Sequence, residues 1–499
     1  HVVGEACTEL ARLAPGAVFH LGGREVTAGE LVAGWTPTPR ASEEASVDPL
    51  SQAARGANGG LDVDAAGPTY SRWTLAVKGP EQLVAPNMQG FQGALGPCSH
   101  GLAPTIRGED LLAQDGARLF CVDLEQGKVR WQFPPAGLVD TIKRKRRTGL
   151  HWADEVPRTV AVYEGTAVTT LCLRREADGL HSKSCYEDPL GLDLVAVDLA
   201  TGQEAWSSVG WADPAIEDVG FLCNPLIRDG VVYAFATRLA DSKTISRELV
   251  AVDVDDGKVR WRTPLPGQAR LKERPQEFER KLAHCARIDE EGGRLFVLAN
   301  DGLCLCADRE TGAILWRRSV ETNDLVIYSQ SFRTESLFAG PSPLALVGTT
   351  LLVLPFGGGP LYALDASTGK ERWSLPGEAA FLVGVSEGRA VLAGDALTLI
   401  DVAARKTLWT FPLQGTLSGR PALVGKVVFV PLLEGIAAVE LATGPKADPA
   451  VPGSIPLLAG YQAQGRGYQW RGAGGHVAVT EGRLVATSTD GLQAWATRK

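Results

Sequence analysis

Cysteine and histidine are the residue types in this sequence whose side chains could build a metal or redox centre. The chain contains nine cysteines and seven histidines. Five of them lie near the beginnings of predicted strands: Cys98, His100, Cys223, His284 and Cys285. Zinc sites combine such ligands at short, regular spacings, and these five follow none. We therefore interpret them as packed residues, with a metal or redox cluster as the alternative.

Disulfide bonds are the other chemistry that the cysteines could support. Cys172 and Cys185 flank a polar, glycine-containing segment that could form a hairpin and bring the two thiols together. Cys223 and Cys285 lie near equivalent positions of neighbouring repeats, so a bridge between repeats is the second candidate. Nine cysteines are compatible with an oxidising compartment. Packed thiols are expected at two strand positions, Cys121 and Cys306.

Signals for catalysis are sparse. Glu217, Asp218 and Asp289 lie outside the repeat turns described below, but no spacing joins them into an acid and base pair. Three consecutive glycines, Gly357–Gly359, follow a predicted strand and open no helix, so they indicate a turn and not a phosphate loop. We predict no catalytic, cofactor-binding or metal-binding residue.

Composition and charge restrict the partners. The 499 residues are 44% hydrophobic, which is ample for a folded core, and the formal net charge of −8 argues against nucleic acid. No run of eighteen apolar residues predicts a membrane-spanning helix, whereas peripheral membrane association stays open. The chain opens on His1, and its single methionine is Met88. We expect that a signal peptide has been removed, although a cloning boundary would look the same.

One strand-turn-strand unit recurs along the chain and organises it. Its clearest copy is LVAVDVDDGKVRW, Leu249 to Trp261. The apolar, β-branched start predicts a buried strand. The Asp and Gly that follow are turn residues, since Asp can bond its own backbone and Gly adopts positive φ at little cost. The alternating end, which closes on a tryptophan, predicts a second strand.

Six copies share an Asp-to-Trp offset of eight: Asp123/Trp131, Asp198/Trp206, Asp253/Trp261, Asp308/Trp316, Asp365/Trp373 and Asp401/Trp409. Glycine occupies offset four in five of them, and Arg405 occupies it in the sixth. A seventh copy has Glu440 in the acid position and Gly444, but no tryptophan. The acids of successive copies lie 36 to 75 residues apart, which is typical of four-stranded propeller blades with loops of variable length.

The two ends of the chain complement each other. Ser71–Gly79, with Trp73, predicts a strand without a hairpin partner, and the last residues predict three strands without a fourth: His476–Thr480, Arg483–Thr487 and Leu492–Thr497. Pairing the two ends would complete a last blade and remove both sheet edges. We therefore predict an all-β, eight-bladed propeller of four-stranded antiparallel blades over residues 71–499. Residues 1–70 form an N-terminal extension that ends in a Pro-, Ser- and Gly-rich linker.

These repeats resemble the tryptophan-docking repeats of the PQQ-like, quinoprotein-type β-propeller family. LVAVDLATGQEAW, Leu194 to Trp206, and LYALDASTGKERW, Leu361 to Trp373, carry the resemblance. It implies that the acid and the tryptophan are structural, with the ring packed between blades. The docking residues would be Trp73, Trp131, Trp206, Trp261, Trp316, Trp373 and Trp409.

The resemblance leads to two functional classes. Quinoprotein dehydrogenases resemble this chain in fold, but they use PQQ, Ca²⁺ and a disulfide between adjacent cysteines. This sequence has no adjacent pair, and Cys304 and Cys306 are one residue too far apart. Cofactor-free, BamB-like scaffold propellers of outer-membrane barrel assembly are also similar. This chain is longer than they are, and Cys7 is not at the terminus where a lipid-bearing cysteine would be required.

Partner binding is expected on irregular segments between the repeats. Three insertions stand out, at residues 134–159, 264–285 and 445–475. The first carries the basic run Lys143–Arg147, which we interpret as a solvated loop. The third combines residue types that are enriched at binding hot spots, namely Tyr461, Arg466, Tyr468, Trp470 and Arg471.

Taken together, the sequence predicts a non-catalytic, extracytoplasmic protein-interaction scaffold without cofactors, in the periplasm or at the outer membrane. Its partners would be other protein subunits of a larger assembly. The alternative is a PQQ-dependent dehydrogenase or a propeller that binds a small molecule.

Overall fold

A computed structural model describes most of the repeat region of the chain. The described residues are 18–21, 24–27, 46–47, 70–76, 103–114, 118–135, 159–171, 173, 192–210, 219–221, 224–241, 244–266, 269–270, 286–299, 301–322, 342–356, 358–413, 417, 419–432, 436–442, 454–455, 474–480, 483–488 and 491–496.

The chain divides into two compact units, residues 1–45 and 46–499. In the first unit, β1 (Val18–Leu21) and β2 (Arg24–Thr27) pair antiparallel as a hairpin. The second unit contains all the repeats. The predicted boundary between residues 70 and 71 stays a prediction.

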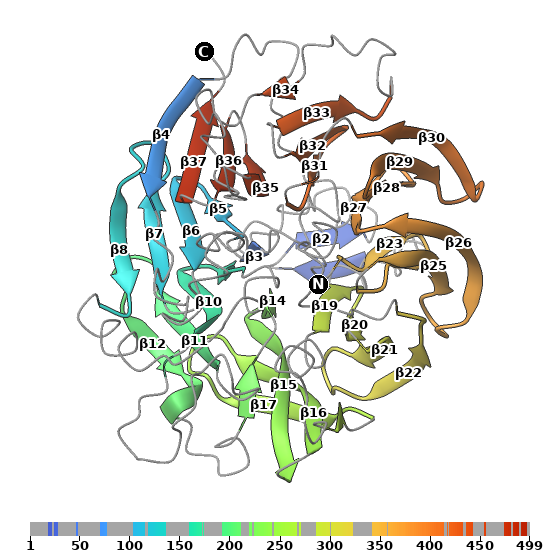
Figure 1. The fold of residues 1–499 in the computed structure, drawn as a ribbon. Helices are drawn as coiled ribbons and strands as arrows, with labels where there is room; N and C mark the ends of the chain where they lie inside the picture. The colour runs from blue at the N-terminus through green and yellow to red at the C-terminus, as the bar shows by residue number, and fades with distance from the viewer. Residues whose placement is uncertain are drawn as a thin grey trace. The chain divides into compact units, whose positions relative to one another are not determined.

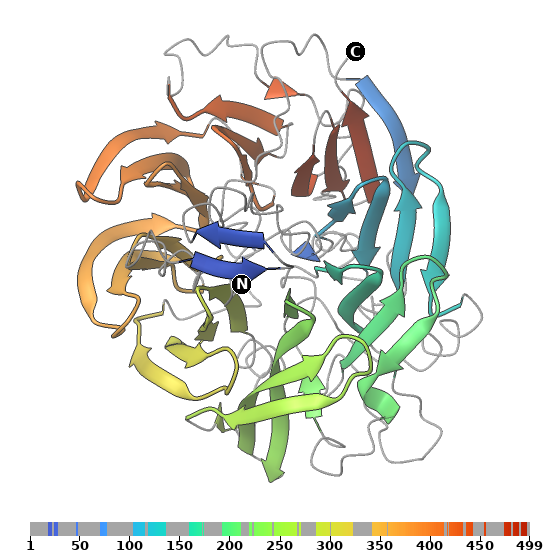
Figure 2. The same cartoon turned by 180° about the vertical axis from the view of Figure 1, so that it is seen from behind.

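The second unit is an all-β propeller of antiparallel blades, most of them four-stranded. The blades follow one another around a ring, which Figure 1 shows from one side and Figure 2 from the other. Blade 1 contains β5 (Thr105–Arg107), β6 (Asp110–Gln114), β7 (Leu119–Asp123) and β8 (Val129–Phe133). Blade 2 contains β9 (Ala161–Tyr163), β10 (Thr166–Leu171), β11 (Asp193–Asp198) and β12 (Glu204–Ser207), with β3 (Ser46–Val47) beside β9.

Blade 3 has six strands, and blades 4 and 5 have four each. The strands of blade 3 are β13 (Val219–Phe221), β14 (Leu226–Arg228), β15 (Val231–Asp241), β16 (Thr244–Asp253), β17 (Val259–Pro264) and β18 (Ala269–Arg270). Those of blade 4 are β19 (Ala286–Glu291), β20 (Arg294–Ala299), β21 (Leu303–Asp308) and β22 (Ile314–Ser319). Those of blade 5 are β23 (Ala345–Val347), β24 (Thr350–Val353), β25 (Gly359–Asp365) and β26 (Glu371–Ala379).

Blades 6 and 7 complete the set of seven sheets that are formed from strands consecutive in the sequence. Blade 6 contains β27 (Phe381–Ser386), β28 (Arg389–Ala393), β29 (Ala396–Asp401) and β30 (Lys406–Pro412). Blade 7 contains β31 (Ala422–Val424), β32 (Val427–Pro431), β33 (Ile436–Glu440) and β34 (Ser454–Ile455).

The remaining sheet, here called the closing blade, confirms the predicted pairing of the two chain ends. Its strands are β35 (Gly474–Thr480), β36 (Arg483–Ser488), β37 (Gly491–Ala496) and β4 (Tyr70–Ala76). β37 pairs with β4 in antiparallel register, with Trp73 opposite Ala494. The innermost strand β35 contacts β5 of blade 1, so the ring is closed.

The prediction of eight four-stranded blades is only partly confirmed. Seven blades are continuous in sequence, and two of these seven have more than four strands. The composite closing blade agrees with the predicted pairing of the chain ends. Blade 2 gains β3 from upstream of the repeats. In blade 3, β13 and β14 pair with different parts of β15. Pro225 lies between them and lacks the N–H that a continuous strand would need.

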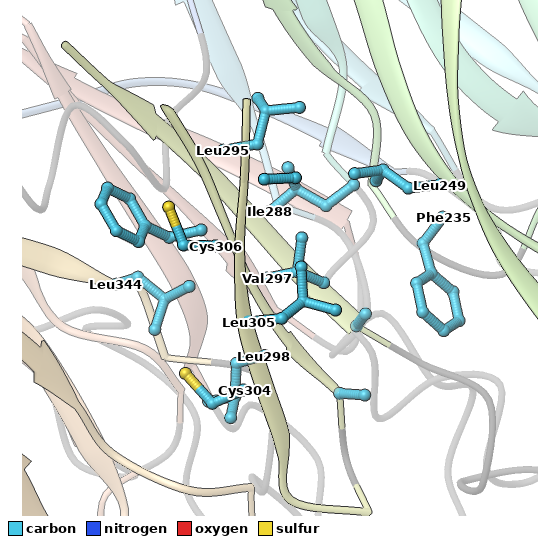
Figure 3. Packing of buried hydrophobic residues seen from close by; sticks show 14 of the residues in the cluster. Phe235, Leu249, Ile288, Leu295, Val297, Leu298, Cys304, Leu305, Cys306 and Leu344 are labelled. Atoms are coloured by element: carbon cyan, nitrogen blue, oxygen red, sulfur yellow. The ribbon is translucent and has the colours of Figure 1, made fainter. Parts of the chain in front are cut away.

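The core lies between neighbouring blades. The largest cluster joins blades 3, 4 and 5 and includes Phe235, Leu249, Leu305 and Leu344, all nearly inaccessible to solvent. Figure 3 shows the alternation that builds it: Leu305 extends to the side of β21 on which Phe235 and Leu249 lie, and Cys304 and Cys306 extend to the other side. Side chains of β21 are thus buried on both faces of the sheet.

Candidate interaction surface

The repeat acids bond the turns that follow them. In blade 5, Oδ1 of Asp365 accepts the backbone N–H groups of Ser367 and Thr368, each at 3.0 Å, and the Ser367 hydroxyl at 2.5 Å. The Ser367 hydroxyl and the guanidinium of Arg372 hold the pKa of Asp365 well below its usual range. Asp198 and Asp308 accept the same type of bonds, and their pKa values are lowered too, chiefly by a threonine hydroxyl. The acid therefore stabilises its own hairpin.

Five of the repeat tryptophans connect consecutive blades. The indole N–H of each donates to the backbone carbonyl of the residue that follows the repeat acid in the next blade. These distances are 2.8 Å for Trp131 to Leu199, 2.7 Å for Trp206 to Val254, 3.1 Å for Trp261 to Arg309, 2.9 Å for Trp316 to Ala366 and 3.4 Å for Trp409 to Leu441. Trp373 packs against the cluster formed by blades 5 and 6. The side chain of Trp73 lies outside the described part of the structure.

The repeat glycines make room for these rings. Gly202, Gly257, Gly312 and Gly369 have φ between +69° and +73°. A Cβ atom on any of them would lie 2.4–2.8 Å from an atom of the preceding blade's tryptophan. Both the left-handed backbone and the close approach require glycine here. This geometry supports our interpretation that the acid, glycine and tryptophan dock the blades.

The face that carries the repeat turns is also crossed by ion pairs. Arg309 of blade 4 contacts Asp229 of blade 3 at 2.6 Å and Glu290 at 3.6 Å. Further pairs join other neighbouring blades: Arg318 to Glu371 at 2.5 Å, Lys426 to Glu387 at 2.9 Å and Arg483 to Glu125 at 2.7 Å. Most of these side chains are partly exposed, so each pair adds little stability by itself.

Blade 3 extends beyond its neighbours at the opposite end from these turns. β15 and β16 have 11 and 10 residues, and their tip lies at the end away from the repeat turn because the strands are antiparallel. β13 and β18 flank the hairpin there. We call these four segments the blade 3 extension: residues 219–221, 236–241, 244–248 and 269–270. Its long strands are drawn in green at the bottom of Figure 1.

Both neighbouring blades hold the blade 3 extension in place. On one side, the N–H of Phe221 donates to the carbonyl of Leu192, next to β11 of blade 2, at 2.9 Å. On the other, Arg247 donates to Asp301 of blade 4 at 2.5 Å and to the carbonyl of Pro266 at 3.1 Å. Arg247 is 4% exposed. A buried arginine that is bonded in two directions fixes the base of the hairpin.

Two described polar groups on the inner strands bond to neighbouring blades. The hydroxyl of Thr105 donates to the carbonyl of Val160 at 2.8 Å, and the N–H of Leu344 donates to Asp289 at 2.8 Å. Asp289 also pairs with Arg287 in the same buried strand. The sequence placed Asp289 in no acid and base pair, and in the structure its carboxylate joins blades 4 and 5.

The described cysteines are buried thiols. Burial raises the pKa of Cys121, Cys304 and Cys306 to about 12 each, so all three stay protonated at neutral pH. Among the residues that the structure describes, no three His, Cys, Asp or Glu side chains gather as a metal site. In the same residues, no helix is long and apolar enough to span a membrane.

The sequence contains one Gly-x-Ser-x-Gly pattern, Gly384 to Gly388. In hydrolases this pattern places the serine on a strand-to-helix turn. Here the segment is the end of β27 and the hairpin turn into β28. The hydroxyl of Ser386 donates to the carbonyl of Gly425 in blade 7 at 3.0 Å. Its observed contact is therefore a bond between blades.

Several predicted residues lie outside the described ranges. They are the disulfide candidates Cys172, Cys185, Cys223 and Cys285, the loop residues Tyr461, Arg466, Tyr468, Trp470 and Arg471, and Cys98, His100 and His284. These predictions stay predictions. The sequence analysis did not identify the blade 3 extension, although residues 231–253 contain its two long strands, β15 and β16.

Comparisons with known proteins give one family match and several similar structures. Residues 191–381 match a family described as outer membrane protein assembly factor BamB. BamB from Moraxella catarrhalis is 14% identical, with 86% of this chain and 99% of that chain covered and a TM-score of 0.46. Quinohemoprotein alcohol dehydrogenase from Comamonas testosteroni is 14% identical, with 90% and 79% covered and a TM-score of 0.54. A comparison with curated proteins gives no match.

At 14% identity, the quinohemoprotein alcohol dehydrogenase structure shows a shared fold and no more. The match over residues 191–381 covers the most regular copies of the repeat, in blades 2 to 5. Together with the tryptophan and glycine geometry, it confirms the resemblance seen in the sequence. The matched family thus covers the repeats over residues 191–381 of this chain.

Proposed function

We propose that this propeller is a non-catalytic scaffold that binds other protein subunits in an extracytoplasmic assembly. The observation that carries the proposal is the blade 3 extension. A hairpin that projects beyond its blade and is anchored at its base to both neighbours offers a partner a surface whose base is already fixed. Binding to such a surface requires little further loss of conformational freedom.

The family match supports an extracytoplasmic location for this role. The matched family is named for assembly at the outer membrane, and an extracytoplasmic scaffold of this kind fits a chain with nine cysteines. We extend the assembly role from the family to this chain as part of the proposal. The partner's identity is a question for experiment.

The proposal is tested by shortening the hairpin. Arg238 pairs with Ser246, so Leu239–Ile245 can be replaced by Asn-Gly, which forms a two-residue hairpin turn at that point. Tagged parent and shortened chains are crosslinked in the source cells under native conditions, and captured proteins are identified by mass spectrometry. We expect the parent to capture a defined set of proteins and the shortened chain to lose at least one of them.

A matched control keeps the test specific. Replacing the exposed Glu387 turn residue by Gln changes the opposite face and should leave capture intact. Thermal unfolding of each variant establishes that the propeller is folded. Identical capture by the parent and by a folded, shortened chain would contradict a binding role for the extension.

The dehydrogenase alternative has a separate readout. The purified chain is titrated with PQQ and Ca²⁺ while its near-UV and visible absorbance is recorded, and alcohols are then supplied with an artificial electron acceptor. The scaffold proposal predicts no saturable binding and no turnover. Stoichiometric cofactor binding with turnover would replace the proposal by the enzymatic one.

A further inference from the structure

The tryptophan of blade 5 is bonded differently from the tryptophans of the other blades. Five repeat tryptophans donate their indole N–H to a carbonyl of the next blade. Trp373 packs against a cluster that includes Ile400 and Val402 of blade 6 and is partly exposed. Within the part of the chain that the structure describes, its indole N–H makes no hydrogen bond to Val402 or to any other residue. A strong donor is therefore available here.

The sequence of the next repeat turn explains this difference. Arg405 occupies the position that glycine holds in the other copies, and its φ of +55° is left-handed like theirs. At four of those glycines a Cβ atom would lie 2.4–2.8 Å from an atom of the preceding blade's ring. Arginine carries this Cβ atom, so the ring of Trp373 has no room for the usual docked position. An arginine at positive φ is also strained, and strain of this kind is concentrated at functional sites.

Two cations in the same turn have no partner among the described residues. Arg405 and Lys406 are both exposed, and neither forms an ion pair there. The acid of the turn, Asp401, accepts the backbone N–H of Ala404 at 2.8 Å and contacts neither cation. The equivalent of Lys406 in blade 3 is Lys258, which is paired with an aspartate of its own turn. The positive charge of the blade 6 turn is therefore not neutralised locally.

The repeat geometry brings the free donor and the free charges to one place. Position 405 is the one that lies against the preceding blade's ring in the other copies, so Arg405 and Trp373 are neighbours. We call Trp373, Arg405 and Lys406 the blade 5–6 junction. The chain is described without interruption over residues 358–413, which include all three.

The chemistry of these side chains favours a carboxylate as the ligand. An indole group can only donate a hydrogen bond, and a guanidinium presents paired N–H groups that match the two oxygens of a carboxylate. A lysine ammonium adds a second point charge. Tryptophan and arginine are also the residue types that contribute most at protein interfaces. Because the proposed function is protein binding, aspartate or glutamate side chains of a partner are the matching source of carboxylates.

We propose that the blade 5–6 junction binds an acidic segment of a partner protein. One carboxylate of the segment accepts the indole N–H of Trp373 and pairs with the guanidinium of Arg405. A second acid of the segment is attracted to Lys406. The inference rests on the proposed scaffold function and deepens it, since it names the chemistry of a partner segment.

A short acidic peptide is the probe. Fluorescein-labelled Gly-Glu-Asp-Glu-Asp-Gly is titrated with the full chain, and binding is measured by fluorescence anisotropy. We expect saturable binding that weakens about tenfold or more when Gln and Asn replace the acids of the peptide. Binding should also weaken severalfold between about 50 and about 300 mM NaCl, because the charges on the chain are exposed to screening.

Arg405→Gly is the most informative variant of the chain. It restores the residue found in the other copies, removes one cation and makes room for the ring to dock. Peptide binding should fall about tenfold or more, and the indole N–H of Trp373 should become protected from exchange with water. The indole signals are followed in ¹⁵N–¹H spectra, with the Trp373 signal identified from Trp373→Phe. That variant keeps an aromatic ring without the donor and should weaken binding severalfold.

A pair of charge reversals locates the site. Lys406→Glu should weaken peptide binding severalfold. The matched change Lys258→Glu lies at the same repeat position in blade 3, where Trp206 of the preceding blade is bonded, and should leave binding unchanged. Thermal unfolding establishes that each variant is folded. Arg405→Gly and Lys406→Glu still test the site if Trp373→Phe fails to fold.

Three results would overturn the inference. One is peptide affinity that is the same in the parent, Arg405→Gly and Lys406→Glu. Another is an indole N–H of Trp373 that is already protected in the parent chain. The third is inorganic phosphate that displaces the peptide with equal affinity, because the junction would then bind small anions in general. None of these results depends on capture through the blade 3 extension, so failure here can be told apart from failure of the scaffold proposal.

Discussion

Blades 4 and 7 show what the complete repeat contributes. In blade 4, Trp316 is 8% exposed, donates to blade 5 and lies against Gly369, and Cys306 beneath it is fully buried. In blade 7 the acid is Glu440, the tryptophan is absent, the outermost strand has two residues, and Ala438 is partly exposed. The difference indicates that the tryptophan covers the outer part of each junction between blades.

The fold of the next blade gives a reason for the missing ring. Each docked tryptophan needs the turn between the third and fourth strands of the following blade. In the closing blade, the third strand is β37 and the fourth is β4, from the other end of the repeat region. The two strands that a short turn joins in the other blades therefore come from distant parts of the sequence in the closing blade. Blade 7, which precedes the closing blade, is the copy whose repeat has no tryptophan at the expected offset.

The largest loss of stability is expected when Trp316 is replaced. Trp316→Ala removes a nearly buried ring and its bond to Ala366, and should lower the free energy of unfolding by about 3–5 kcal/mol. Chemical denaturation with fluorescence detection measures it. A variant as stable as the parent would show that the ring does not hold blades 4 and 5 together.

The second largest loss of stability is expected at Gly369, the glycine that lies against the Trp316 ring. Gly369→Ala places a Cβ 2.4 Å from Trp316 at a positive φ, and we expect a loss of about 2–4 kcal/mol. Gly388→Ala is the matched control, because its φ is +74° and no atom lies within 4 Å. It should lose only about 1–2 kcal/mol. Equal losses at both glycines would mean that backbone conformation alone, and not the ring, explains the requirement.

The third expected effect compares the same enlargement at two equivalent small residues, Ala363 in blade 5 and Ala438 in blade 7. Ala363→Leu adds volume under Trp373 at a fully buried position and should cost about 1–3 kcal/mol. Ala438→Leu makes the same change at the equivalent position of blade 7, which is partly exposed, and should stay within about 0.5 kcal/mol of the parent. The two unfolding free energies are compared directly. A larger loss at Ala438 would contradict this difference between the two positions.

The smallest effect concerns pH. The folded-state pKa of Asp365 lies below its unfolded value, so its stabilising contribution is present above the ordinary carboxyl pKa, near 4, and is lost as the pH falls through the folded value. The stability gap between the parent and Asp365→Asn should therefore narrow as the pH drops from about 5 toward 2. Because the carboxylate is partly exposed, the gap should be small throughout. A gap that widens in acid would reverse the assigned shift.

The sequence predicts the repeat and the closure because both depend on local rules. The Asp-to-Trp offset, the turn glycine and alternating apolar residues determine each hairpin, and unmatched strands at two distant places predict the pairing of β4 with β37. The extra strands of blades 2 and 3 could not be predicted in the same way. β3 has two residues, and the split of β13 from β14 depends on how β15 is paired over its whole length.

The candidate surfaces were harder to predict, since they depend on what lies next to them in space. Arg247 appears in the sequence as an ordinary strand arginine, and only the fold brings it to Asp301, 54 residues away. Ala438 resembles its counterparts in other blades by residue type, but it is partly exposed whereas they are buried. The predicted loop at 445–475 stays a prediction, because most of it lies outside the described residues.

The central claim is that the tryptophan-bearing strand covers the third strand of its blade, whereas the equivalent Ala438 of blade 7 is partly exposed. One measurement tests it directly. Hydrogen exchange of the native chain, followed by mass spectrometry, compares peptides over residues 436–440 of β33 and 303–307 of β21. The account predicts that the Ala438 amide exchanges within the earliest time points while the Cys306 amide stays protected. Equal, strong protection of both segments would contradict it.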